Sequence, residues 1–208
     1  MKKVLAFAMA LAMVFSMAGC GNGSNSGSTN SGGDEVETLK IGVVCPISGV
    51  SAIAGKYITN GVEVVENELG GKIDIKGKEY NIEFIYMDNE ASEEKTTNVF
   101  QKLIEEEKVI AIVGPDMSKC ALAAGPIAQN AKCPIVTTFA TNTAVTEVGD
   151  YIFRACFIDP FQGQMAAQYI WESGYETASI MFNNADAYAT GLKDAFIESY
   201  EALGGQIL

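Results

Sequence analysis

Short apolar runs alternate with amphipathic segments along this chain from Leu39 to its last residue, Leu208. The short runs are typical of buried strands, and the longer segments carry apolar residues three or four positions apart, as helices do. Such alternation predicts an α/β fold in which a doubly wound, parallel sheet has helices on both faces. Strands are predicted over 39–45, 80–87, 109–113, 134–138, 152–155 and 177–182.

Helices are predicted between these strands, over 53–69, from 92 onward, from 118 to about 130, and over 161–173 and 188–203. Gly70 and Gly71 end the first helix, Ser92 is the expected N-cap of the second, and a hairpin is expected around 73–78. The final strand has only begun at Gln206, so we expect a C-terminally truncated fragment of a longer protein.

The first residues have the pattern of an export signal. Lys2 and Lys3 precede an apolar stretch from Val4 to Phe15, and small residues then lead to Cys20. This resembles a lipoprotein signal, with residues 1–19 as the signal peptide and Cys20 as the lipidation site. An ordinary signal peptide with a chance cysteine is the alternative.

The following residues contain only Gly, Asn, Ser and Thr from 21 to 33, which predicts a flexible linker over 20–37. The expected location is therefore the outer face of the cytoplasmic membrane, or its periplasmic side, through a lipid anchor.

Composition excludes several classes of function. The chain has a formal net charge of −12, no His and no basic cluster, so we expect no nucleic-acid partner. Cys45, Cys120, Cys133 and Cys156 lack zinc-site spacing, and we interpret them as buried free thiols, with no metal and no cofactor. Without His, a Ser or Cys nucleophile lacks its usual base, so an enzyme is not expected.

The stretch VIAIVGPDMSKCALAAGPIA, residues 109–128, reads as a strand, a loop and a helix start. Free backbone N–H groups at a helix start bind anions. The glycine patterns of dinucleotide and P-loop sites are absent, and Asp116 would repel a polyphosphate. Asp116 either points to solvent or indicates a more cationic ligand.

A small carboxylate fits this loop better. Ser118 adds a hydroxyl donor, and a second polar loop, TTFATN at 137–142, follows the next strand. Because parallel strands end at the same sheet edge, the two loops are expected to hold one carboxylate between them. The alternatives are a plain N-cap for Ser118 and a turn residue for Thr141.

Five segments, taken in order, resemble the branched-chain amino-acid-binding proteins, type I periplasmic-type binding proteins that feed ABC transporters. They are KIGVVCPISGVSAIAG, IEFIYMDNEAS, VIAIVGPDMSKCALAAGPIAQNAKCPIVTTFATN, YIFRACFIDPFQGQMA and FNNADAYATGLKDAF. The resemblance implies a two-lobed clamshell, with residues 38–157 in an incomplete first lobe and 158–208 beginning the second. It also implies a monomer that delivers an amino acid to a permease with ATPase subunits.

The resemblance also implies roles for individual residues. Ser118 and Thr141, with the backbone of Phe139 and Ala140, would bind the ligand's carboxylate. Asp159 would meet the ligand's ammonium, although it could instead be only the N-cap of the next helix. Tyr188 would close over the ligand from the second lobe.

Two alternatives concern the ligand and its use. Ala54 stands where the family often has an aromatic residue, so leucine, isoleucine or valine cannot be assumed. The same clamshell could also sense an amide or another small carboxylate and report it to a signalling partner. The predicted lipid anchor favours import.

Overall fold

The structure is a computed structural model that describes residues 36–208. The predicted signal peptide, the lipidation site at Cys20 and nearly all of the predicted linker lie outside the described residues. Within the described residues, no helix is both long enough and apolar enough to cross a membrane.

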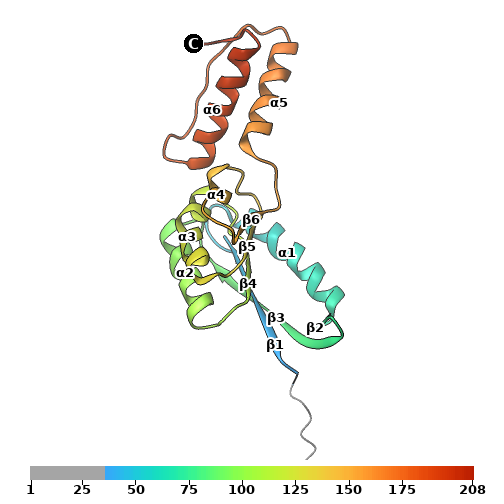
Figure 1. Cartoon of the computed structure of the whole chain (residues 1–208). Helices are drawn as coiled ribbons and strands as arrows, with labels where there is room; N and C mark the ends of the chain where they lie inside the picture. The colour runs from blue at the N-terminus through green and yellow to red at the C-terminus, as the bar shows by residue number, and fades with distance from the viewer. Residues whose placement is uncertain (1–35) are drawn as a thin grey trace, which may run out of the picture. The chain divides into compact units, whose positions relative to one another are not determined.

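A six-stranded sheet organises residues 38–154 of the chain (Figure 1). Its strands are β1 (Thr38–Cys45), β2 (Lys72–Ile75), β3 (Lys78–Asp88), β4 (Ala111–Val113), β5 (Ile135–Thr137) and β6 (Ile152–Arg154). They lie in the order β2-β3-β1-β4-β5-β6, and only β2 runs antiparallel to its neighbour. The chain runs from β1 to β3 on one side and then crosses to β4 on the other. The strand order therefore reverses between β1 and β4, where ligands bind in doubly wound sheets.

Helices cover both faces of this sheet, as predicted (Figure 1). On one face α1 (Ala52–Leu69) packs through Ile58 and Val62 against Val43 of β1. On the other, α2 (Glu93–Glu105) and α3 (Ser118–Ala131) enclose the larger core. Val43 faces α1 and Val44 faces the core enclosed by α2 and α3, because successive strand residues point to opposite faces of the sheet.

Local signals fixed several boundaries correctly. The first helix ends at Gly70 in the left-handed conformation, with φ of 59°. Ser92 caps α2, and its hydroxyl accepts a hydrogen bond from the Lys95 N–H at 3.4 Å. The expected hairpin is the β2–β3 pair. A short helix, α4 (Ala144–Glu147), was not predicted.

The C-terminal part contains α5 (Asp159–Glu172), α6 (Ala187–Ala202) and a two-stranded parallel sheet of β7 (Thr177–Ala178) and β8 (Gln206–Ile207). The two helices pack closely because Gly163 brings α5 against α6, where a Cβ would lie 2.7 Å from the Ala195 backbone. The strand predicted over 177–182 was too long. Within the described residues, positions 179–182 have no neighbouring strand and so no ladder.

Candidate functional site

Two polar loops lie side by side at the carboxyl edge of the sheet, next to the β1–β4 reversal. β4 and β5 are parallel neighbours, with Ile112 opposite Ile135. The loops that follow them are therefore adjacent, as the sequence predicted. The Asn142 N–H at the end of the second loop donates to Ser118 Oγ at the start of α3, at 3.3 Å.

Ser118 is the first residue of α3 and is almost fully buried. The N-cap is Met117, and no side chain caps the helix, so the plain N-cap interpretation of Ser118 is wrong. The first bond of the helix runs from the Ala121 N–H to the Met117 carbonyl at 2.9 Å. The N–H groups of the first turn therefore lack helical acceptors, as anion binding at a helix start requires. Because Ser118 Oγ accepts from Asn142, its own proton remains available to donate.

Arg154 of β6 holds the second loop in place. One guanidinium nitrogen, Nη1, donates to the Ala140 carbonyl at 3.0 Å and the Asn142 carbonyl at 2.8 Å. The other, Nη2, donates to the Thr143 carbonyl and to Thr146 Oγ1. These bonds direct the loop carbonyls toward Arg154. This positioning role was not predicted from the sequence, where its only signal is a lone basic residue in an apolar strand.

Thr141 and Asp159 meet beside Ser118 and leave polar atoms without partners. The Asp159 N–H donates to the Thr141 carbonyl at 3.1 Å. Within the described residues, Thr141 Oγ1 and both carboxyl oxygens of Asp159 are buried without a hydrogen bond. Burial raises the pKa of the Asp159 carboxyl, while the nearby Thr141 hydroxyl and the Arg154 charge lower it in part. The turn-residue reading of Thr141 leaves its buried hydroxyl unexplained.

Asp159 is the first residue of α5, and Ile158 is the N-cap. The side chain of Asp159 makes no capping hydrogen bond, so the interpretation that it serves only as an N-cap is wrong. Burying a carboxylate without a partner costs roughly several kcal/mol of folding free energy, so buried acids normally have a partner. Asp159 therefore has a capacity for a cationic or hydrogen-bond-donating group that residues 36–208 do not fill.

Helix α6 reaches this junction through Asn142, which was not among the predicted site residues. Asn142 Nδ2 donates to the carbonyl of Ala187, the first residue of α6, at 2.8 Å. Tyr188 follows directly and is 38 % exposed, and its hydroxyl accepts from Gln162 Nε2 at 3.1 Å. The structure thus connects Tyr188 to the loop that carries Thr141, but the Tyr188 side chain faces Gln162.

The other two predicted residues of this loop, Phe139 and Ala140, differ in their exposure. Ala140 is fully buried within the loop. Phe139 is 57 % exposed and lines a cavity of about 410 Å³ together with Tyr57 of α1 and Val113. The predicted role concerned the Phe139 backbone, which lies in the same loop as Thr141.

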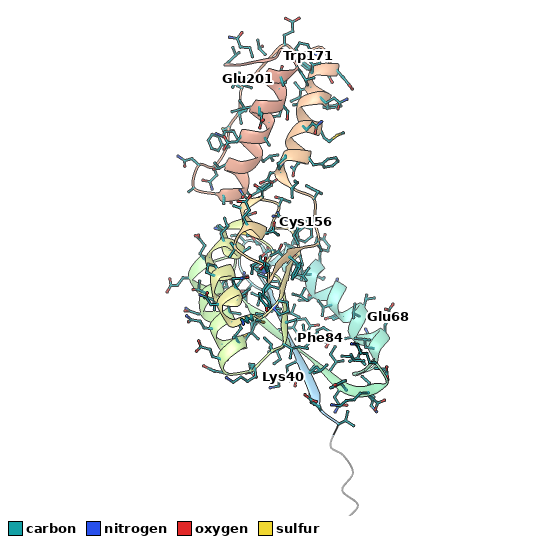
Figure 2. All side chains as sticks on the ribbon, in the orientation of Figure 1. Lys40, Glu68, Phe84, Cys156, Trp171 and Glu201 are labelled. Carbon is teal, nitrogen blue, oxygen red and sulfur yellow. The ribbon has the colours of Figure 1, made fainter. Side chains whose placement is uncertain are left out.

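Asp116 does not point to solvent, because the residue is 4 % exposed. Its Oδ1 has no hydrogen bond within the described residues, and burial raises the pKa of its carboxyl. Among the described residues, Cys45, Cys120, Cys133 and Cys156 are free thiols, but Cys156, in the segment between the sheet and α5, is only half-buried (Figure 2). No group of three or more possible metal ligands occurs among residues 36–208.

Residues 38–208 match the family described as "Periplasmic binding protein". This match covers most of the chain. The chain belongs to the periplasmic binding protein family. Members are solute-binding proteins, not enzymes, and membership implies an extracytoplasmic location.

Relatives and solved structures agree with this assignment. An "Amino acid binding protein" of Pseudomonas aeruginosa is 28% identical over 165 residues, covering 79% of this chain and 44% of that protein. The branched-chain amino-acid transporter substrate-binding protein LivJ from Streptococcus pneumoniae, solved in complex with isoleucine, is similar with a TM-score of 0.73 and 32% identity, over 83% of this chain and 48% of that one.

A third similar protein binds a different ligand. A solute-binding protein of an ABC transporter from Rhodopseudomonas palustris was solved in complex with 3,4-dihydroxybenzoic acid. It matches with a TM-score of 0.75 and 29% identity, over 82% of this chain and 46% of that one. The chain therefore spans about half the length of the proteins it matches, and the ligands of these relatives share a carboxylate.

Proposed function

We propose that this protein captures a free amino acid outside the cytoplasm and delivers it to the permease of an ABC importer. Residues 38–157 and 158–208 contribute to two lobes that close on the ligand. The observation that carries this proposal is the pairing, at one junction, of donors suited to a carboxylate with an unpaired buried acid. A zwitterion needs both kinds of partner if it is to leave water.

The carboxylate end is assigned to the two strand-end loops. Ser118 Oγ, at the start of α3, has a proton free to donate, and Thr141 Oγ1 is buried without a partner in the described part of the chain. The backbone N–H groups of Phe139 and Ala140 belong to the same loop. Charge-assisted hydrogen bonds of this kind are about twice as strong as neutral ones.

The ammonium end is assigned to Asp159. A benzoate-type ligand carries a carboxylate but no cation, so it would leave both oxygens of Asp159 unpaired. An amino acid satisfies them, which favours amino acids over aromatic acids for this chain. Tyr188, on the neighbouring helix, supplies an apolar ring and a hydroxyl that can cover the bound ligand.

Titration calorimetry on the complete protein tests this function. The panel holds the amino acids, their amides, and benzoate and hydroxybenzoates. We expect heat from a group of amino acids and none from benzoates, since these lack the ammonium. Binding of aromatic acids alone, or no binding across the panel, would contradict the proposal.

Ser118→Ala and Thr141→Ala locate the site within the same experiment. Each should weaken binding by about 1–3 kcal/mol, because a buried carboxylate loses a donor. Thr97→Ala and Ser173→Ala are matched controls, since each removes an exposed hydroxyl that bonds only to a carbonyl of its own helix. Unchanged affinity in both site variants would place the ligand carboxylate elsewhere.

A further inference from the structure

We propose that Asn142 is a positioning residue that couples the carboxylate loop to helix α6 and so sets where Tyr188 stands relative to Ser118. This inference rests on the proposed function for its consequence in ligand binding. The coupling itself is a property of the ligand-free chain.

Three groups of Asn142 bind three different elements. Its backbone N–H donates to Ser118 Oγ at the start of α3. Its side-chain Oδ1 accepts from the Ala144 N–H at 3.0 Å, at the start of α4. Its side-chain Nδ2 donates to the Ala187 carbonyl at 2.8 Å, at the start of α6. One residue therefore connects two residues proposed to contact the ligand, Ser118 directly and Tyr188 through its neighbour.

Gly191 allows α6 to come this close. A Cβ at Gly191 would lie 2.7 Å from Asn142 Nδ2 and 2.6 Å from Asp159 Oδ2, which is closer than atoms can approach. The glycine lies one turn after Ala187 on the same helix. The absence of a side chain at this position lets α6 rest directly on Asn142 and Asp159.

The consequence for binding follows from preorganisation. Asp186 caps the start of α6 by accepting from the Tyr188 N–H, and the Asn142 Nδ2 bond to Ala187 joins this helix start to the carboxylate loop. Without the Nδ2 bond, the first turn of α6 would sample more positions, and the ligand would have to order it on binding. Ordering of this kind lowers affinity without removing any contact with the ligand.

The test uses two variants, each with a matched control. Asn142→Asp keeps the oxygen that accepts from the Ala144 N–H, loses the donor to Ala187 and adds a negative charge near Asp159. Its control is Asn81→Asp, which removes a comparable bond from Asn81 Nδ2 to the Val36 carbonyl at 3.2 Å. Gly191→Ala pushes α6 away, and its control is Gly61→Ala in α1, where a Cβ would meet nothing within 4 Å.

The first readout needs no ligand. Hydrogen exchange is followed by mass spectrometry over the first turns of α6 in the ligand-free protein. We expect faster exchange there in Asn142→Asp and Gly191→Ala, and wild-type exchange in both controls. Exchange unchanged in both site variants would overturn the coupling, even if the wild-type protein binds no amino acid.

The second readout is a double-mutant cycle with Tyr188→Ala, measured by calorimetry. Asn142→Asp should weaken binding by about fivefold or more in the wild type, and by less than about twofold when Tyr188 is already absent. Equal losses in both backgrounds would mean that Asn142 does not act through Tyr188, and would overturn the positioning role. Failure of the wild type to bind any ligand would instead contradict the proposed function and leave the exchange result to decide the coupling.

Discussion

Two carboxylates near the same edge of the sheet have opposite surroundings. Asp88, at the end of β3, accepts hydrogen bonds from the Ile47 N–H at 2.9 Å, the Glu90 N–H at 2.8 Å and Ser48 Oγ at 2.6 Å. Asp159, after β6, is buried and accepts none within the described residues. The fold thus satisfies the first acid and leaves the second one available.

The pKa directions follow this difference. Partial burial raises the pKa of Asp88, but its hydrogen bonds from Ser48, Glu90 and Ile47 outweigh burial and lower the pKa overall. At Asp159 burial outweighs the hydroxyl and guanidinium groups nearby, and the pKa rises. Asp88 therefore stabilises the loop after β1, whereas Asp159 destabilises the ligand-free chain and gains a partner when an ammonium binds.

The largest expected effect is on ligand affinity. Asp159→Asn removes the proposed partner of the ammonium and should weaken amino-acid binding by about 1.5–3 kcal/mol, roughly 10- to 150-fold. Asp88→Asn makes the same change where the acid serves only the chain, and should alter affinity by less than about threefold. Calorimetry on both variants measures this. Equal losses of affinity in the two variants would show that Asp159 has no special role in binding the ligand.

The next-largest effect is on the free energy of unfolding, which Asp159→Asn should raise even though it weakens ligand binding. The raised pKa of Asp159 means that the folded chain holds its proton longer than the unfolded chain. Stability is therefore lost as pH rises from the unfolded value, about 3.9, through the folded one. Asp159→Asn should remove this loss and raise the free energy of unfolding at pH 7 by about 1–2 kcal/mol.

Urea unfolding of the ligand-free protein at several values between pH 3 and pH 7 checks this prediction. The difference in unfolding free energy between Asp159→Asn and the wild type should widen as pH rises through the acid range and then stay constant. A variant less stable than the wild type at pH 7 would show that Asp159 is satisfied in solution by a group of the chain.

The smallest effect is expected at Asp88. Its lowered pKa contributes stability that is present above the unfolded value and lost as pH falls through the folded one. Asp88→Asn should lower the free energy of unfolding at pH 7 by about 0.5–1.5 kcal/mol, since its bonds persist in weaker form. The same urea series measures it, and the gap from the wild type should narrow toward pH 3. A difference in unfolding free energy that stays constant over this pH range would show that the charge of Asp88 does not contribute to stability.

Much of the fold could be predicted because it depends on local patterns. The apolar runs, the glycines at 70–71 and the cap at Ser92 each determine an element or its end within a few residues. The strand predicted over 177–182 was too long because a strand needs a neighbour as well as an apolar run. The short helix α4 was missed because four residues carry too little periodicity to read.

The candidate site was predicted in part. The adjacency of the Ser118 and Thr141 loops follows from the order of β4 and β5, which the βα alternation already predicts. Arg154 and Asn142 could not be found in this way. Their partners lie on other elements, at Ala140 and Thr146 for Arg154 and at Ala187 for Asn142, and no spacing along the chain indicates such bonds.

The sequence by itself therefore determined the α/β class, the layered arrangement and the two strand-end loops, because periodicity and strand order are properties of neighbouring residues. Only the tertiary structure decided which polar groups remain without partners. Within the described residues, it leaves both carboxyl oxygens of Asp159 and Oδ1 of Asp116 buried without a hydrogen bond, satisfies Asp88, and brings Gly191 against Asn142. Whether a carboxylate is satisfied depends on atoms from distant elements, and these meet only after the chain has folded.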